Sequence, residues 1–465
     1  MEKIIETGFA HTYITPAVGK EIPGLLHKRV AEGILDPLYA RACVVDDGST
    51  RLAIVQVDAI VVGDALVAEA RRLIQRRCGI ARENVLIAAT HTHSGGPVCD
   101  LFSSEADPEY VHALIERIAW AVTKACSVMR PVLAGAHVTS CEGVAFNRRF
   151  LMKGGAQATH PGKLNPDIVA PAGPADPSVL VAGFCDPDTL KPVGCLVNFA
   201  CHATHINGTQ FSADYPKWIV DTLQAVHGPE FGVVFLNGAC ADVTQMDNQD
   251  GRPGEFGPYW ATRTGQAVGA AALKGLALTR WRANTSVDRA VQKVQCSVRE
   301  ISEVDEKAAR ELVEKHGAGA GRSETLFASE LLQVAEQRKK KAKHRLEVQA
   351  MRLGEVLLWT APGELFQAYA LDVRDRSPFP LTRCVELTNG YAGYICTPAA
   401  FEGGGYEVRT ARSSFLDAEA GGRLGAAAVD LAKQLYARAG DDMVCAHTSY
   451  VWPSADDEPL RGISE

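Results

Sequence analysis

The chain has 465 residues, of which 46% are hydrophobic and 22% are charged, and its net charge is −7. These values are typical of a globular protein with a large core, and the absence of a basic field argues against a nucleic-acid partner. No run of 18 apolar residues predicts a membrane span, and the first eight residues lack the apolar segment of a signal peptide.

The 13 cysteines include no CxxC pair, and several of them, such as Cys43, Cys195 and Cys201, lie within apolar, strand-like runs. This pattern is typical of buried, reduced thiols rather than of a disulfide framework. Together with the missing signal segment, it predicts a cytoplasmic location.

The first 150 residues alternate between strand-like and helix-like patterns. Strand-like runs at 38–46 and 52–58 flank the turn Asp46-Asp47-Gly48, which predicts a hairpin. Helical periodicity covers 65–78 and 110–129, and further strand-like runs cover 85–90 and 132–139.

Residues 151–178 are rich in glycine, proline and alanine, and we expect a long loop there, either functional or simply solvated. Apolar runs at 178–184, 193–200 and 231–237 then predict strands, and 259–278 predicts a long helix. Polar residues follow several of these strands directly. Because ligands bind at the carboxyl ends of strands in open α/β sheets, these positions are candidate site residues.

Residues 300–345 contain two charged amphipathic helices separated by a glycine-rich segment at 317–321, which indicates a helical insertion, either a lid or an appended hairpin packed on the surface. The following residues predict a hairpin at 348–360, a strand at 382–387, a helix at 418–437 and a polar tail at 449–465. We therefore expect a single α/β catalytic domain over 1–448, built on a mixed central β-sheet flanked by helices. The hairpins argue against an all-parallel sheet.

The most informative segment is the one that directly follows the strand predicted at 85–90. Its sequence is His91-Thr92-His93-Ser94-Gly95. Residues i and i+2 of an extended chain point to the same side, so both imidazoles can face one pocket. Imidazole is a common metal ligand, and this predicts a metal ligand with a second imidazole beside it.

Three further strand-end features accompany this segment, namely Asn198 to His202, Pro362-Gly363-Glu364, and Tyr394 with Tyr406 twelve residues later. In this combination the chain resembles the catalytic domain of the neutral (non-lysosomal) ceramidase family over about residues 7–440. Supporting segments are Ile14-Thr15-Pro16, the run from Asp36 to Ala42, and Asn147-Arg148.

The resemblance implies a zinc-dependent hydrolase that cleaves N-acyl amide bonds with a metal-activated water. It assigns the zinc ligands to His91, His202, Glu364 and Tyr394, and it places His93, Arg148 and Tyr406 around the reacting carbonyl. Imidazole nitrogen and carboxylate oxygen suit zinc, and a bound dication would favour the phenolate form of a tyrosine. His93 is the candidate for protonating the leaving amine, since an imidazole titrates near neutral pH.

Several alternatives stay open on the residues alone. His205 can replace His202 as a ligand, and Arg149 can replace Arg148. Glu364 can instead cap a helix, Tyr394 and Tyr406 can be core aromatic residues, and Asp214 can bind substrate or cap the helix after Pro216, which we favour slightly.

The sequence departs from the family in Gly403-Gly404-Gly405, which replaces a polar stretch before the second tyrosine. Family members typically carry a C-terminal β-sandwich domain, and we expect this chain to correspond to the catalytic domain alone. We therefore predict a small soluble substrate with an amide bond, or a lactam, ester or lactone, rather than ceramide with its two lipid chains. The competing hypotheses are a non-catalytic ligand-binding protein on the same fold and a cysteine hydrolase that uses Cys201 or Cys240. The sequence does not indicate the oligomeric state.

Overall fold

Eight strands form the large sheet of this computed structural model, which describes residues 5–283, 285–317 and 323–440. In spatial order they are β14 (Gly232–Asn237), β12 (Pro192–Phe199), β11 (Ser178–Cys185), β6 (Arg130–Ser140), β1 (Ile5–Tyr13), β3 (Tyr39–Asp46), β4 (Arg51–Val57) and β5 (Val85–Ala89). The pairs at the two ends, β12 with β14 and β4 with β5, are parallel, and the other neighbours are antiparallel. The predicted mixed sheet is therefore confirmed.

A second, four-stranded sheet lies in the order β16 (Val287–Ser297), β17 (Lys343–Leu353), β18 (Val356–Thr360) and β20 (Leu381–Val385). Both predicted hairpins are present. Asp46 pairs with Arg51 around Gly48, and Leu353 pairs with Val356 around Gly354. Both glycines have a positive φ, which glycine adopts without steric strain.

The two sheets face each other across a shared apolar core, to which the large sheet contributes Val45 and Leu180 and the small sheet contributes Met351 and Leu358. Because successive strand residues point to opposite faces, Val44 lies on the other side and packs beneath helices. The sequence did not separate the strands into two sheets, since strands of both sheets, such as β4, β5 and β18, are apolar on both of their faces.

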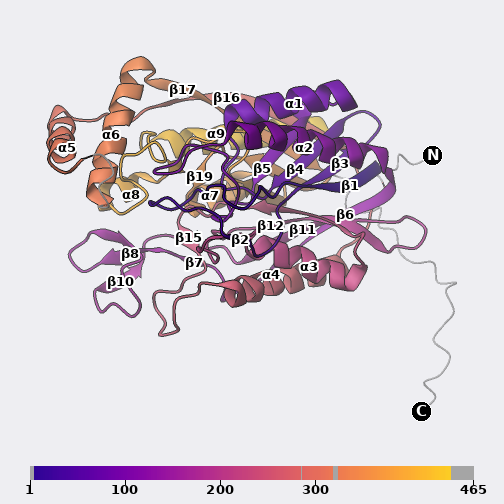
Figure 1. The fold of residues 1–465 in the computed structure, drawn as a ribbon. Coiled ribbons are helices and arrows are strands. Elements are labelled where there is room, and N and C mark those ends of the chain that lie inside the picture. Colours follow the sequence, from indigo (N-terminus) through magenta and orange to yellow (C-terminus); the bar gives the residue numbers. More distant parts are fainter. Residues whose placement is uncertain (1–4, 284, 318–322, 441–465) are drawn as a thin grey trace, which may run out of the picture.

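Helices cover the outer face of each sheet (Figure 1). On the large sheet lie α1 (Asp64–Cys78), α2 (Pro108–Ser127), α3 (Tyr215–His227) and α4 (Pro258–Leu278), and on the small sheet lie α7 (Gln367–Arg376) and α9 (Ala420–Ala439). The result is four layers, helix–sheet–sheet–helix. No helix in the described ranges has the length and apolar character needed to cross a membrane.

The predicted helical insertion is confirmed as α5 (Glu303–His316) and α6 (Ser323–Lys340). It leaves the chain between β16 and β17, which are themselves antiparallel neighbours with Ser297 paired to Lys343. The insertion therefore extends one end of a hairpin without interrupting the sheet. Residues 318–321 of the glycine-rich connection lie outside the described residues, and so does the predicted tail at 449–465.

The prediction of a long loop at 151–178 is wrong in part, because a separate three-stranded sheet occupies part of this range. Its strands are β8 (Arg149–Met152), β9 (Gln157–Thr159) and β10 (Ile168–Pro171), in the order β10-β8-β9. The turn after β8 uses Gly154 and Gly155, both with a positive φ. Strands of three or four residues carry too little periodicity for a sequence pattern to reveal them.

The remaining elements are short and lie in the connections. They are β2 (Gly33–Ile34), η1 (Arg82–Asn84), β7 (Phe146–Asn147), β13 (Gln210–Phe211), β15 (Val243–Thr244), β19 (Glu364–Leu365), β21 (Tyr394–Ile395) and α8 (Pro398–Gly403). Three of the two-residue ladders, β13 with β2, β15 with β7 and β19 with β21, join segments that are far apart in the sequence.

The core between the sheets makes a testable contribution to stability. Leu358 is 1% exposed within it, and we expect Leu358→Ala to lower the free energy of unfolding by about 2–5 kcal/mol, the range for a buried leucine that leaves a cavity. Urea unfolding measures the loss. Val304→Ala, at a position that is 77% exposed, serves as the control and should change stability by less than about 0.5 kcal/mol. Equal effects of the two variants would contradict the packing of the sheets.

Candidate metal centre

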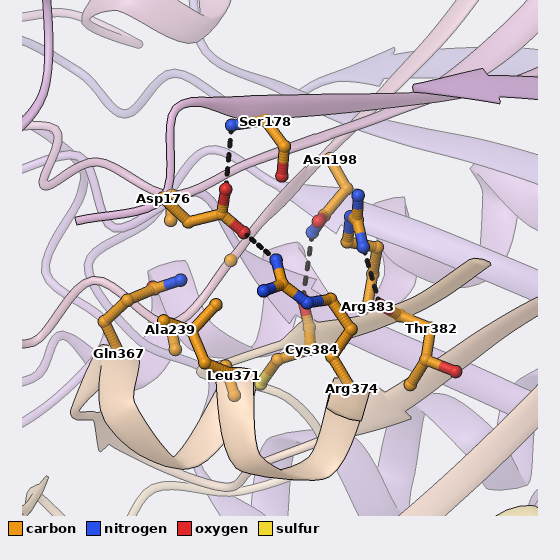
Figure 2. Close-up of a pocket in the computed structure, with 13 residues that line it drawn as sticks. Asp176, Ser178, Asn198, Ala239, Gln367, Leu371, Arg374, Thr382, Arg383 and Cys384 are labelled. Carbon is orange, nitrogen blue, oxygen red and sulfur yellow. Dashed lines mark hydrogen bonds and ion pairs between the residues drawn. The ribbon is translucent and has the colours of Figure 1, made fainter. Parts of the chain in front are cut away.

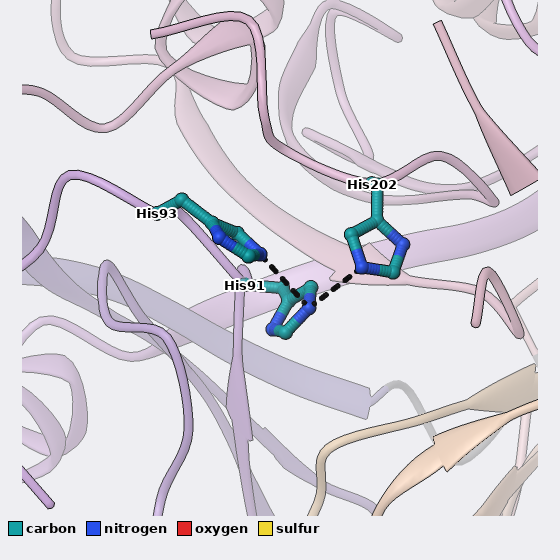
Figure 3. Close-up of side chains that lie close together, drawn as sticks. All are labelled: His91, His93 and His202. Carbon is teal, nitrogen blue, oxygen red and sulfur yellow. Dashed lines mark hydrogen bonds between the residues drawn. The ribbon is translucent and has the colours of Figure 1, made fainter. Parts of the chain in front are cut away.

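Three histidine side chains meet where β5 and β12 end (Figure 3). His91 Nε2 lies 3.1 Å from His202 Nε2 and 3.3 Å from His93 Nε2. His91 and His202 are almost fully buried. Among the residues that the structure describes, this is the one cluster of at least three His, Cys, Asp or Glu side chains with the spacing of metal ligands.

His91 and His93 lie side by side, as the sequence predicts, but not through an extended strand. β5 ends at Ala89, and His91 has φ of +66°, in the left-handed region that few residues other than glycine adopt. The amide of His91 donates to the carbonyl of Ala59, which holds this turn against the loop after β4. Strain of this kind clusters at functional sites.

Each imidazole is oriented by its second nitrogen. The Nδ1 atoms lie within hydrogen-bonding distance of backbone carbonyls, at 2.8 Å for His91 and Ile60, 2.8 Å for His93 and Gly24, and 2.7 Å for His202 and Cys240. A carbonyl can only accept, so each Nδ1 carries the proton and donates. The three Nε2 lone pairs therefore point toward one another, which is the tautomer that metal-binding histidines use.

Glu364 completes this arrangement. Its Oε2 lies 3.3 Å from His91 Nε2 and 3.5 Å from His202 Nε2, and this buried oxygen has no hydrogen-bond partner among the described residues. Its Oε1 accepts a hydrogen bond of 2.9 Å from the hydroxyl of Tyr391. The glutamate is not a helix cap, because it lies in β19 and α7 begins three residues later.

The protonation states favour a cation at the centre. Burial lowers the pKa of His202 to about 4 and the pKa of His93 well below its usual value, so both rings are neutral at pH 7. Burial opposes ionisation of Glu364, but the neighbouring histidines outweigh it and hold the pKa of this carboxyl well below its usual range. Burial likewise disfavours a charged His91, yet Glu364 outweighs it and raises the pKa of this ring. The ionised Glu364 therefore favours positive charge directly beside it.

The spacing also suits a metal of zinc's size. A tetrahedral site with bonds of about 2.0–2.1 Å has edges of about 3.3–3.4 Å between ligand atoms. The separations that join His91, His202 and Glu364 are 3.1, 3.3 and 3.5 Å. The donor set, two imidazoles and one carboxylate, is one that zinc accepts. The residues present therefore fit the ion that the family resemblance implies.

Tyr394 is brought beside Glu364 by the short ladder of β19 and β21, in which the two residues pair directly. A side chain at Gly363 would meet the carbonyl oxygen of Gly393 at 2.5 Å, so the close approach requires glycine there. The Tyr394 hydroxyl accepts a hydrogen bond of 3.1 Å from Arg148 Nη2. Burial raises the pKa of Tyr394 well above its usual value, although the charge of Arg148 favours the phenolate.

Arg148, not Arg149, faces the centre. Its Nη2 donates to Tyr394, and its Nε lies 2.9 Å from Glu407 Oε1. Arg149 pairs with the other carboxylate oxygen of Glu407 and donates to the carbonyl of Gly404. Sequence reasoning missed Glu407, although it directly follows the predicted Tyr406, and it missed Tyr391 although it lies in the same segment as Tyr394.

Tyr406, the last predicted site residue, packs its ring edge-on against Tyr394, with 5.9 Å between ring centroids. Burial raises the pKa of Tyr406 above its usual range. All seven predicted residues are thus connected by contacts within one region, namely His91, His93, His202, Glu364, Tyr394, Arg148 and Tyr406.

The alternative residues have other partners. His205 is fully buried with its Nδ1 2.8 Å from Asp214 and its Nε2 3.0 Å from Thr264, outside the histidine cluster. Asp214 caps α3 by accepting from the amide of Tyr215, as the sequence favoured.

The two candidate cysteine nucleophiles are buried, and burial raises the pKa of both Cys201 and Cys240 well above the usual value. The Cys240 thiol donates at 2.9 Å to Glu386, whose own pKa burial raises to about 8. Protonated thiols with such partners are poor nucleophiles.

A small pocket lies beside one face of α7 (Figure 2). Arg374 on this helix pairs with Asp176 at 2.9 Å, and Asn198 donates to the carbonyl of Cys384 at 2.9 Å. None of the predicted site residues lines it. Its lining includes Ala200, which lies two residues before His202, and Gln367, which lies three residues after Glu364.

Comparison with known proteins supports the fold. No protein-family model matches the sequence. The crystal structure of neutral ceramidase from Pseudomonas aeruginosa is similar, with a TM-score of 0.72 and 18% identity over 94% of this chain and 75% of that chain. A structure described as ceramidase complexed with C2 matches equally well, with a TM-score of 0.72, 18% identity, and 94% and 76% of the two chains covered. At this identity, the likeness shows a shared architecture, which agrees with the α/β fold predicted from sequence.

Glu407 yields a prediction about the integrity of this region. It is fully buried and pairs with both Arg148 and Arg149, and leaving a buried charge without its partner typically destabilises a protein by about 3–5 kcal/mol. We expect Glu407→Gln to lower the free energy of unfolding, measured in urea, by an amount toward this range. Glu402→Gln, on the exposed side of α8, is the control. A stability unchanged in Glu407→Gln would show that the carboxylate does not hold the two arginines.

Proposed function

We propose that this protein is a zinc-dependent hydrolase that cleaves an amide bond of a small molecule. The observation that carries the proposal is the convergence of His91 Nε2, His202 Nε2 and an otherwise unpartnered Glu364 Oε2. Without a cation, these lone pairs would oppose one another in a buried space, at a high electrostatic cost. The ceramidase-like fold supports the same class of reaction.

His91, His202 and Glu364 would hold the zinc ion, and Tyr394 is proposed as the fourth ligand because it pairs with Glu364 across β19 and β21. A bound zinc ion supplies Lewis acidity, which polarises a carbonyl and lowers the pKa of water toward about 7. The three backbone carbonyls behind the histidines keep each ring in the tautomer that binds metal.

His93 would move protons during the reaction. Its Nδ1 is committed to the carbonyl of Gly24, which leaves Nε2 as the atom that accepts a proton. Because burial keeps the pKa of His93 low, its protonated form is a strong acid and would readily pass the proton to the departing amine. Its Nε2 also lies within the histidine cluster, so a role as a further ligand is the alternative for this residue.

Arg148 and Tyr406 would stabilise the negative charge that develops on the carbonyl oxygen. Arg148 stays charged and is held by Glu407 and Tyr394, so it needs little reorganisation when this charge forms. A preorganised donor of this kind is typically worth about 3–4 kcal/mol of activation free energy. Hydrolysis yields a carboxylic acid and an amine, with water supplying the hydroxyl group and the proton.

The substrate we propose is a compact amide rather than ceramide, because Gly403 to Gly405 replaces the polar stretch found in the family and changes the wall next to Tyr406. A lactam, ester or lactone would undergo the same attack on a carbonyl. The intact donor set argues against a non-catalytic binding protein, in which at least one ligand should have been lost. A cytoplasmic location is proposed on the cysteine pattern alone.

Metal content tests the site directly. We expect about one zinc ion per chain in the purified protein by inductively coupled plasma mass spectrometry, and less than a tenth of that in His202→Ala, because removing a first ligand abolishes tight binding. His205→Asn is the matched control, since this neighbouring histidine pairs with Asp214 and should leave the zinc content unchanged. Equal zinc in all three proteins would disprove the assignment of His202.

Activity tests the proposed roles. In a screen of N-acyl amines, N-acyl amino acids and lactams, we expect turnover that a chelator abolishes and zinc restores. His93→Ala should retain zinc and lose about 10²–10⁴-fold in kcat, the range for a general acid–base residue. If His93→Ala loses its zinc, the residue is a ligand instead. If alkylation of cysteines stops turnover while chelation does not, the cysteine hypothesis replaces this one.

A further inference from the structure

The helical insertion contributes an aromatic ring to the region of the proposed site. Phe327 on α6 is only 6% exposed. Its ring meets Tyr406 edge-on, with 6.0 Å between ring centroids, and it meets Phe102 at 5.9 Å. The Arg409 guanidinium lies over the ring at 3.7 Å from its centroid.

These contacts extend as a chain of aromatic rings from the metal centre. Tyr394 touches Tyr406, Tyr406 touches Phe327, and Phe327 touches Phe102. We call Tyr406, Phe327 and Phe102 the aromatic wall. Its three members come from the segment after α8, from the insertion and from the loop that follows the His91 segment, so it exists only when these parts are assembled.

The helix that carries Phe327 is firmly attached to the same loop as Tyr406. Glu330, 2% exposed on α6, accepts hydrogen bonds from the Arg412 side chain at 2.7 and 3.0 Å and from the Arg412 amide at 2.9 Å. A bidentate ion pair of this kind, with the carboxylate buried and the arginine half-buried, fixes both distance and orientation. α6 is thus held in a fixed position, and so is the Phe327 ring that it contributes to the aromatic wall.

Phe327 is also restrained on several sides. Two aromatic rings contact it at steep angles, and the Arg409 guanidinium lies over one of its faces. A substrate group that reached the position of this ring would have to displace it and break these contacts. The wall therefore sets a limit on size in the direction that leads away from Tyr394 and Tyr406.

We infer that Phe327 is a specificity-determining residue. It restricts the proposed site to amides with a short nonpolar acyl chain. This inference rests on the proposed function, since it assigns the wall to the substrate that Arg148 and Tyr406 would act on. It gives the insertion at 300–345 a role in selecting the substrate.

Replacing Phe327 by smaller residues tests the inference in the zinc-loaded full-length protein. The 4-nitroanilides of acetic and hexanoic acid serve as short and long substrates, and the ratio of kcat/KM for the long to the short one is the readout. In Phe327→Ala we expect this ratio to rise at least tenfold, since a few methylene groups in an apolar pocket change kcat/KM by about 10–200-fold or more. Phe327→Leu should shift it in the same direction by less, and covers the case in which the alanine variant does not fold.

Val334→Ala is the matched control. Val334 is a fully buried residue on the same helix, but it packs in the core beneath the small sheet rather than in the wall. It should lower stability and leave the ratio unchanged. A ratio that stays within twofold of the unaltered protein in both Phe327 variants, or that rises equally in Val334→Ala, would overturn the inference.

Binding of the acid product gives a readout that does not depend on turnover. Calorimetry measures the affinities of hexanoate and acetate for both proteins. We expect the ratio of hexanoate affinity to acetate affinity to be at least tenfold higher in Phe327→Ala than in the unaltered protein. If the unaltered protein hydrolyses neither anilide and this relative affinity still shifts, the proposed function is in doubt while the wall stands. An unchanged relative affinity overturns the wall whether or not amides are cleaved.

Discussion

The fold places several nitrogen and oxygen lone pairs close together in one buried space. His91 Nε2 lies 3.1 to 3.3 Å from the Nε2 atoms of His202 and His93 and from Glu364 Oε2, and His202 Nε2 lies 3.5 Å from the same carboxylate oxygen. Such an arrangement is unfavourable for neutral or anionic groups alone, and a shared cation resolves it. The assignment of a zinc hydrolase depends on this constraint, and the positions of the surrounding arginine and tyrosines gain a chemical meaning only through it.

The fold maintains this constraint by backbone contacts rather than by long side chains. His91 and His93 emerge from the end of β5, and His202 from the end of β12, at opposite regions of one sheet. The amide of His93 donates to the carbonyl of Ala203, which ties the two segments together. Glu364 and Tyr394 arrive on the β19 and β21 ladder that follows the second sheet. The site therefore lies where elements of both sheets meet.

Local patterns in the sequence predicted much of this arrangement. The hairpins, the strand at 85–90 and the helices at 65–78 and 110–129 follow from periodicity and turn residues, and they match β3, β4, β5, α1 and α2 closely. The site residues required the family resemblance as well, because Glu364 and Tyr394 have no local pattern of their own. Arg148 and Arg149 could not be separated by sequence, since only tertiary contacts decide which of them meets Tyr394 and which meets Gly404.

Residues missed by the sequence analysis act through long-range contacts. Glu407 contributes a buried carboxylate to two arginines more than 250 positions away, and Phe327 reaches the site from an insertion with the composition of a solvated helix pair. The three-stranded sheet at 149–171 was hidden because its strands have only three or four residues, too few for a readable pattern. Such features depend on which segments meet in space, and a single sequence does not contain that information in readable form.

The most direct test of the central claim is a crystal structure with diffraction data collected on both sides of the zinc absorption edge. The account predicts one anomalous peak per chain that is present above the edge and absent below it, lying within about 2.0–2.2 Å of His91 Nε2, His202 Nε2 and Glu364 Oε2. A zinc-loaded crystal with no peak among these three atoms, or with the peak held by other residues, would contradict it.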